Sequence, residues 1–148
     1  MKYRDYTNDR LFGNYSCVDR WGGDDKREED PIKIKYMLSN YGRDPYTKQG
    51  DVIVGFYANE PNAFFYTNKT SKRQQKRKLI YMNVSEQCQV TKTLNIEDGS
   101  GCTLWMGYFT VENNPPRRCE KAYKNCGGQT KLQYHKSCKP VYSWQPRG

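Results

Sequence analysis

Six cysteines are the residues of this chain whose chemistry is easiest to predict. They are Cys17, Cys88, Cys102, Cys119, Cys126 and Cys138. A zinc site takes four cysteine or histidine ligands in closely spaced pairs, and the chain has no Cys-x-x-Cys pair and only one histidine, His135. We therefore expect disulfides and no metal, with His135 on the surface.

Three glycosylation motifs accompany the cysteines. They begin at Asn14, Asn68 and Asn83. N-linked glycans and disulfides belong to the same secretory route, so their coincidence predicts a secreted, extracellular glycoprotein. No apolar run approaches the roughly 20 residues of a membrane span, and no signal peptide opens the chain. We expect no membrane span and a trimmed N-terminal segment.

Catalysis has little support in the residue inventory. One histidine, no Gly-x-Ser-x-Gly motif and no recognisable pair of carboxylates leave few groups for acid–base or nucleophilic chemistry. We expect a monomeric binding protein that is not an enzyme and uses no cofactor.

The net charge of +9 is concentrated in residues 71–78, which carry five positive charges and no negative one. Such a run can bind heparin, an anionic membrane or nucleic acid, or it can simply keep a hairpin tip in water. We favour the hairpin tip and expect no nucleic-acid partner.

The length of 148 residues fits a single domain over 1–148, with a C-terminal tail over 137–148. Apolar residues alternate with polar ones over 32–39, as in a strand with one buried face. Other strands are expected within 1–12 and over 11–18, 51–57, 63–67, 78–83, 87–94, 102–109 and 131–134, and a polar loop over 22–31. Strands at such intervals, with turn residues between them, are typical of an all-β sandwich or barrel.

One helix is expected over 116–126, between two prolines and two glycines. Cys119, Tyr123 and Cys126 would share one face of it.

The strand that starts at Cys102 has two different faces. Alternation places Cys102 on one face and Thr103 and Trp105 on the other. If the helix covers the first face, Cys102 reaches one helical cysteine and Cys88, on the neighbouring strand, reaches the other. Trp105 then points into whatever the sheet encloses. Cys17 and Cys138 remain, and would tie the start of the chain to its end.

With these residues in view, the chain resembles the tick salivary lipocalins of the histamine-binding type over nearly its whole length. The matching motifs are Tyr15-Ser16-Cys17-Val18, Asn62-Ala63-Phe64-Phe65-Tyr66, Gln87-Cys88-Gln89-Val90, Thr103-Leu104-Trp105 and Pro116-x-x-Cys119. The resemblance implies a lipocalin-like, eight-stranded antiparallel barrel with the C-terminal helix packed on its outside. It also implies disulfides Cys17–Cys138 and Cys88–Cys119, with Cys102–Cys126 similar to an extra bond found in part of the family.

The resemblance further implies a ligand cavity lined by Phe64, Tyr66 and Trp105, and we expect Tyr36 to bind the ligand as well. The acidic residues that histamine binders carry are replaced here: Thr103 precedes Trp105, Gln89 follows Cys88, and Lys35 and Lys78 match acidic positions on two earlier strands. A buried ammonium needs a carboxylate, whereas a buried anion needs a cation. We expect a fatty-acid-like anion such as a leukotriene as ligand, with a biogenic amine such as histamine or serotonin second. Alternatively, Lys35 and Lys78 point outward and the cavity is neutral.

These expectations predict a secreted protein that sequesters a small host mediator and so aids evasion of host defence. The alternative is a protein-binding inhibitor of complement or of another immune protein, which would use the barrel loops and the basic hairpin.

Overall fold

The computed structural model describes residues 1–6, 10–13, 15–21, 32–39, 48–96, 99–127, 131–132, 134–135 and 138. Within these residues, nine strands form one antiparallel sheet in the order β2-β3-β4-β5-β6-β7-β8-β1-β9. The strands are β1 (Tyr3–Arg4), β2 (Cys17–Trp21), β3 (Ile32–Ser39), β4 (Lys48–Tyr57), β5 (Glu60–Asn68), β6 (Gln74–Asn83), β7 (Cys88–Ile96), β8 (Gly99–Met106) and β9 (Lys131–Leu132). One helix, α1 (Arg117–Lys124), follows β8.

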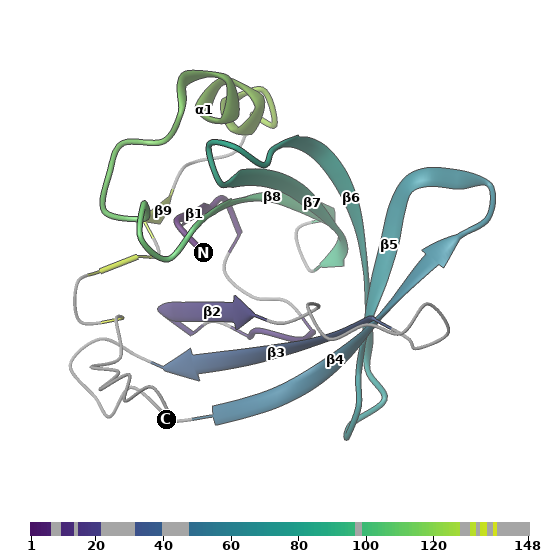
Figure 1. Cartoon of the computed structure of the whole chain (residues 1–148). Coiled ribbons are helices and arrows are strands. Elements are labelled where there is room, and N and C mark those ends of the chain that lie inside the picture. Colours follow the sequence, from purple (N-terminus) through teal and green to yellow (C-terminus); the bar gives the residue numbers. More distant parts are fainter. Residues whose placement is uncertain are drawn as a thin grey trace.

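The sheet curls into a half-barrel (Figure 1). Strands β2 to β4 form one wall and β6 to β8 the facing wall, with β5 at the bend between them. The predicted lipocalin-like fold class is therefore confirmed. In the described part of the chain the two edges, β2 and β9, are not paired with each other. The Cys17–Cys138 disulfide joins β2 to the segment that follows β9 across this seam.

Most predicted strands are confirmed, and their limits differ where turns intervene. The strand expected over 11–18 is wrong, because residues 10–13 form a turn and β2 begins at Cys17. Strand β8 ends at Met106, since the chain turns where the Thr110 amide donates to the Gly107 carbonyl at 3.1 Å. The loop expected over 22–31 lies outside the described residues, as does the tail over 137–148 apart from Cys138.

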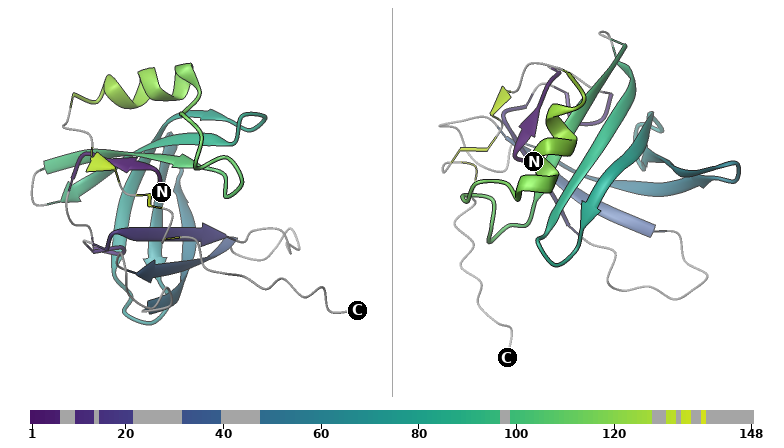
Figure 2. Two further views of the ribbon diagram at one scale, coloured as in Figure 1. Left: turned by 90° about the vertical axis from the view of Figure 1, so that its left-hand side faces the viewer. Right: turned by 90° about the horizontal axis from the view of Figure 1, so that it is seen from above.

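The predicted helix is confirmed and lies on the outside of the half-barrel (Figure 2). It begins after Pro116, and beyond its end Gly127 takes a φ of 80°, which glycine adopts without strain. Cys119 and Tyr123 are buried against the outer face of β6 to β8, where they pack with Cys88, Val90, Cys102 and Leu104. Disulfides Cys88–Cys119 and Cys102–Cys126 fasten α1 to β7 and β8, and all three disulfides match the pairs that the resemblance implies. The described residues include no helix of the length and apolarity needed to cross a membrane.

An aromatic cluster fills part of the barrel interior. Phe12 lies at its centre, with its ring centroid 5.7 Å from Tyr36, 6.5 Å from Tyr66 and 5.9 Å from Trp105. Met1, Leu11, Val18, Leu38 and Val52 are the other buried residues of this inner core. The three contacts with Phe12 are edge-on, the arrangement that aromatic rings prefer. The turn over 10–13 therefore supplies the residue that holds β3, β5 and β8 together from inside.

A buried polar cluster adjoins the inner core. Arg77 is fully buried, donates to the Thr93 hydroxyl at 2.6 Å, and lies over the ring of Phe12. The hydroxyl of Tyr6 contacts those of Thr93 and Thr103 at 3.2 and 2.9 Å. The expectation that 71–78 is a solvated hairpin tip is thus only partly right, because β6 begins at Gln74 and its alternation turns Arg77 inward.

A close approach requires glycine at position 50. Gly50 on β4 is the register partner of Tyr36 on β3, and the Tyr36 ring lies where a β-carbon on residue 50 would be. The Tyr36 hydroxyl accepts a hydrogen bond of 2.7 Å from the Asn68 side chain, which holds the ring in this position. Glycine at 50 therefore allows the ring to lie across the inner face of the sheet.

Replacing Gly50 by alanine is expected to lower the free energy of unfolding by about 1–3 kcal/mol, the usual cost of overpacking a core. Urea denaturation would measure it. In the Gly50→Ala/Tyr36→Leu double variant the overlap is gone, so the two single losses should not add. Additive losses would contradict the proposed clash.

Candidate ligand-binding site

Two adjoining cavities occupy the end of the half-barrel where β4 and β6 finish. The larger has a volume of about 460 Å³, and its walls include Ile34, Val54, Phe64 and Leu79 from β3 to β6. The smaller has a volume of about 290 Å³ and lies against Trp105 on β8. Three side chains line both cavities: Arg20, Met82 and Gln89. The larger volume falls in the range typical of small-ligand sites.

Arg20 crosses the interior between the two cavities. It is the register partner of Tyr36, so its side chain leaves the inner face of β2. Its guanidinium lies 4.0 Å from the centroid of the Trp105 ring and donates hydrogen bonds to the Tyr66 hydroxyl and the Gln89 side-chain oxygen. Arg20 thereby connects β2 with β5, β7 and β8.

The charge of Arg20 is retained in this setting. Burial lowers the pKa of Arg20 from its ordinary value and nearby Arg77 lowers it further, while Tyr66 acts in the opposite direction. An arginine guanidinium nevertheless keeps its proton at neutral pH. It offers five N–H groups, and among the described residues Tyr66 and Gln89 take only two of them as hydrogen-bond acceptors. Arg20 can therefore also donate to a ligand oxyanion.

Four of the predicted ligand-binding residues meet at these cavities. Phe64 and Tyr66 line the larger cavity, Trp105 lines the smaller, and Gln89 lines both. The Trp105 indole N–H donates to the Thr91 hydroxyl at 3.2 Å, which fixes the ring beneath Arg20. The expectation that Trp105 points inward, away from α1, is confirmed.

Tyr36 and Thr103 lie inside the barrel but line neither cavity. Tyr36 packs on Phe12 within the inner core, and Thr103 is fully buried beneath Tyr6, whose hydroxyl contacts it at 2.9 Å. The Thr103 hydroxyl is therefore already engaged by Tyr6.

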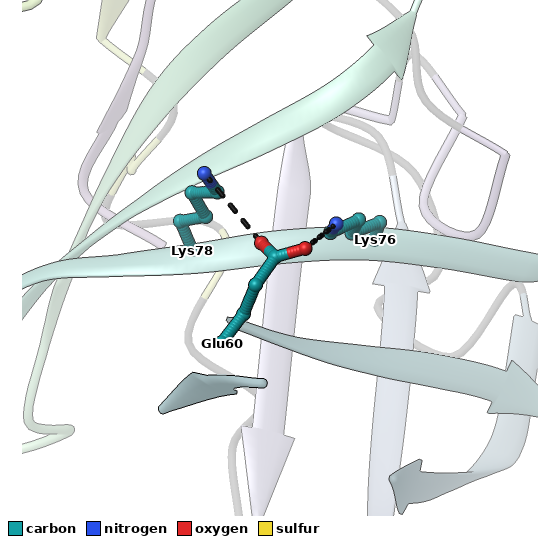
Figure 3. Close-up of polar contacts among 3 residues, drawn as sticks. All are labelled: Glu60, Lys76 and Lys78. Atoms are coloured by element: carbon teal, nitrogen blue, oxygen red, sulfur yellow. Dashed lines mark hydrogen bonds and ion pairs between the residues drawn. The ribbon is translucent and has the colours of Figure 1, made fainter. Parts of the chain in front are cut away.

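Lys35 and Lys78 are on the outer face, so their assignment to the cavity is wrong. Lys35 is exposed opposite Asp51, because Ile34 and Tyr36 on either side of it point inward. Lys78 is the register partner of Ala63, and its ammonium lies 3.6 Å from the Glu60 carboxylate (Figure 3). The cation that the anion hypothesis requires is instead Arg20.

Sequence reasoning missed both interior arginines. The expected strand over 11–18 stopped before Arg20, and the expected strand over 78–83 started after Arg77. Extending each strand by two residues would have revealed them, since alternation puts Arg20 on the face of Val18 and Arg77 on the face of Leu79. The alternation that identifies both arginines as inward-facing was therefore present in the sequence, but the predicted strand limits excluded these two residues.

Asp19 is the carboxylate of the smaller cavity among the described lining residues. Burial raises the pKa of Asp19 above its usual value, while the N-terminal ammonium of Met1 and the neighbouring Arg20 lower it. The Asp19 carboxylate also accepts the backbone N–H of Arg20 at 2.8 Å. The Asp19 carboxylate therefore already accepts a hydrogen bond from the backbone of β2.

The glycosylation motifs differ in how free their amide nitrogens are. Asn14 lies outside the described residues. The Asn68 side-chain nitrogen donates inward to Tyr36, so a glycan there would have to replace that hydrogen bond. Asn83, at the end of β6, donates only to the exposed Glu86 at 2.8 Å among its described contacts. Asn83 is therefore the better placed of these two acceptors.

A curled antiparallel sheet with an outer helix, around a largely apolar cavity with one arginine at its boundary, defines a small-ligand-binding protein of the lipocalin type. No curated protein and no solved structure matches the chain significantly. The family described as tick histamine binding protein matches residues 1–140, and the chain belongs to this family.

Proposed function

We propose that this protein is secreted and sequesters a small host mediator in the larger cavity, and that the mediator is a fatty-acid-like carboxylate such as a leukotriene. One observation carries the proposal. Among the described residues that line the larger cavity, Arg20 alone bears a charge, and that charge is positive. A planar guanidinium binds a carboxylate through two parallel hydrogen bonds, which fixes the ligand's charged end. Capture of such a mediator would aid evasion of host defence.

The walls of the larger cavity suit an apolar tail. Ile32, Ile34, Val54, Phe64 and Leu79 present hydrocarbon to the space. Each methylene group buried there contributes about 0.8 kcal/mol, so a long chain gains far more than a compact ring does. A ligand whose carboxylate binds Arg20 and whose apolar tail lies between β3 and β6 would therefore match both the charged and the apolar parts of the cavity lining.

A biogenic amine is the second candidate, since Asp19 lines the smaller cavity. The family description refers to histamine, and an ammonium requires a carboxylate partner inside a protein. In this chain Arg20 lies beside Asp19 and repels a second cation, and the burial that raises the pKa of Asp19 favours its neutral form. We therefore expect histamine to bind more weakly than a fatty acid.

Calorimetric titration of the full chain tests this proposal with three ligands. Palmitic acid and the alcohol of equal chain length differ only in the carboxylate, and histamine carries the opposite charge. The acid should bind at least about tenfold more tightly than the alcohol, since a hydrogen bond to a charged group contributes about 1.5–3 kcal/mol. Equal affinities for acid and alcohol, or tighter binding of histamine, would overturn the proposed ligand class.

A further inference from the structure

A row of basic side chains follows the outer face of β6 and the hairpin that precedes it. We define this basic stripe by six residues: Lys69, Lys72, Arg73, Lys76, Lys78 and Lys92. The first three are exposed in the β5–β6 hairpin. Lys76 and Lys78 alternate with the inward-facing Arg77, so they point outward. The stripe is therefore continuous from the hairpin into the sheet.

Two of these cations face each other directly. Lys78 on β6 is the register partner of Lys92 on β7. Side chains at such positions have their β-carbons about 4.5–5.5 Å apart, and like charges there are destabilising. An anion bound between β6 and β7 would relieve this repulsion.

The chain itself shows that the stripe accepts an oxyanion. The Glu60 carboxylate lies between Lys76 and Lys78, with nitrogen–oxygen distances of 2.8 and 3.6 Å (Figure 3). The hydrogen bond from Lys76 holds the pKa of Glu60 below its usual range. Lys76 also lies over the Tyr57 ring, 4.4 Å from its centroid, so its ammonium is held in place. One carboxylate is thus bound by two of the six cations of the stripe.

We propose that the basic stripe binds a linear sulfated polysaccharide of the heparan sulfate type. Alternate residues of a strand lie about 6.6–6.8 Å apart, so Lys76 and Lys78 present charges in a line that an extended polyanion can follow. The hairpin cations lengthen this line at one end, and Lys92 broadens it beside Lys78. Sulfated polysaccharides are extracellular, as a protein with three disulfides is expected to be.

Two other polyanions fit this surface less well. Membrane binding favours several apolar side chains beside the basic ones. Of the exposed large apolar side chains that the structure describes, Phe56, Met82, Val84 and Phe109 lie toward the opposite end of the barrel from the hairpin, and Ile80 follows Lys78 on β6. Single-stranded nucleic acid stacks its bases on open aromatic rings. Tyr57 and Phe65, on the face of the stripe, pack against each other with ring centroids 5.4 Å apart, so these two rings are engaged with each other and suit base stacking poorly.

The first test compares two matched double variants of the full chain on immobilised heparin and by calorimetry with a short heparin oligosaccharide. Lys76→Gln/Lys78→Gln removes two charges from the stripe. Lys33→Gln/Lys35→Gln removes two from the exposed outer face of β3. The first pair should weaken binding roughly five- to thirtyfold and the second less than about twofold, as expected for exposed ion pairs. Equal losses would overturn the stripe as the binding surface.

A second comparison predicts a gain in affinity. Glu60→Gln frees Lys76 and Lys78 from their internal carboxylate and should tighten heparin binding roughly two- to fivefold. Glu86→Gln changes the net charge equally, but Glu86 lies at the other end of β6, in the turn to β7. Equal gains in both variants would show that overall charge alone attracts the polymer and would overturn the proposal.

Three controls complete the design. Thermal unfolding confirms that each variant is folded. Lys72→Gln/Arg73→Gln removes two charges from the hairpin and should also weaken heparin binding, without any substitution in the sheet. Phosphatidylserine vesicles and single-stranded DNA, at equal ionic strength, serve as competing polyanions. Binding to either as tight as to heparin would contradict the assignment to a sulfated polysaccharide. The stripe lies outside the barrel, so this result is independent of the cavity ligand.

Discussion

Arg20→Met is expected to weaken the binding of a long-chain fatty acid roughly 10- to 150-fold, since a hydrogen bond to a charged group contributes about 1.5–3 kcal/mol. Methionine retains an unbranched apolar chain of similar reach but offers no donor to a carboxylate. Arg20→Lys should give an intermediate loss, because an ammonium keeps the charge and cannot reach Tyr66, Gln89 and a ligand with one planar group. Calorimetric titration of each variant with palmitic acid measures both effects.

Lys35→Met and Lys78→Met are the matched controls for this prediction. Each removes one positive charge from the outer face of the sheet, and neither residue lines either of the two described cavities. Their affinity for the fatty acid should stay within about twofold of the unaltered chain, as for exposed charges in general. A loss at Lys35 or Lys78 equal to that at Arg20 would mean that net charge, and not a contact in the cavity, attracts the ligand.

Removing the Cys17–Cys138 disulfide is expected to lower the free energy of unfolding by about 5 kcal/mol, because the loop it closes is long. The two cysteines are 121 residues apart. The same chain-entropy relation assigns about 3.5 kcal/mol to Cys102–Cys126, whose cysteines are 24 residues apart. A domain of this size has only about 5–15 kcal/mol of stability in total. Without the long-range bond, the chain should therefore approach its unfolding threshold.

Guanidinium denaturation of the Cys17→Ala/Cys138→Ala and Cys102→Ala/Cys126→Ala chains measures the two losses side by side. Each variant removes one disulfide and leaves no free thiol, so they differ chiefly in loop length and position. A larger loss for the Cys102–Cys126 bond would show that fastening α1 matters more than joining the edges of the sheet across the seam. That outcome would contradict the ranking.

Local patterns in the sequence predicted the elements well. Over 32–38 the apolar side chains expected to face the interior alternate with Lys33, Lys35 and Met37, and Ile34, Tyr36 and Leu38 do face it. The prolines and glycines around α1 marked its ends, since each restricts the backbone in a known way. The spacing of Cys119 and Tyr123 placed both on the buried face of that helix.

The site was harder to predict because it depends on strand register. A shift of one residue moves every side chain of a strand to the opposite face. Lys35 and Lys78 were assigned to the cavity by comparison with acidic positions, across gaps that left the register open, and both lie outside. Arg20 was missed because the expected strand ended at Val18, whereas β2 continues to Trp21. The burial of Thr103 beneath Tyr6 could not be predicted, because the two residues are 97 positions apart and no local pattern reveals their contact.

The aromatic cluster around Phe12 has a consequence for how such a protein works. In the described part of the chain these rings fill the interior beyond Arg20, so a ligand would enter and leave the cavity through the same opening. Under the proposed function, each chain holds a fixed number of ligand molecules. Its capacity to lower the concentration of a mediator therefore scales with the dose of protein, and the duration of capture is set by the rate of escape.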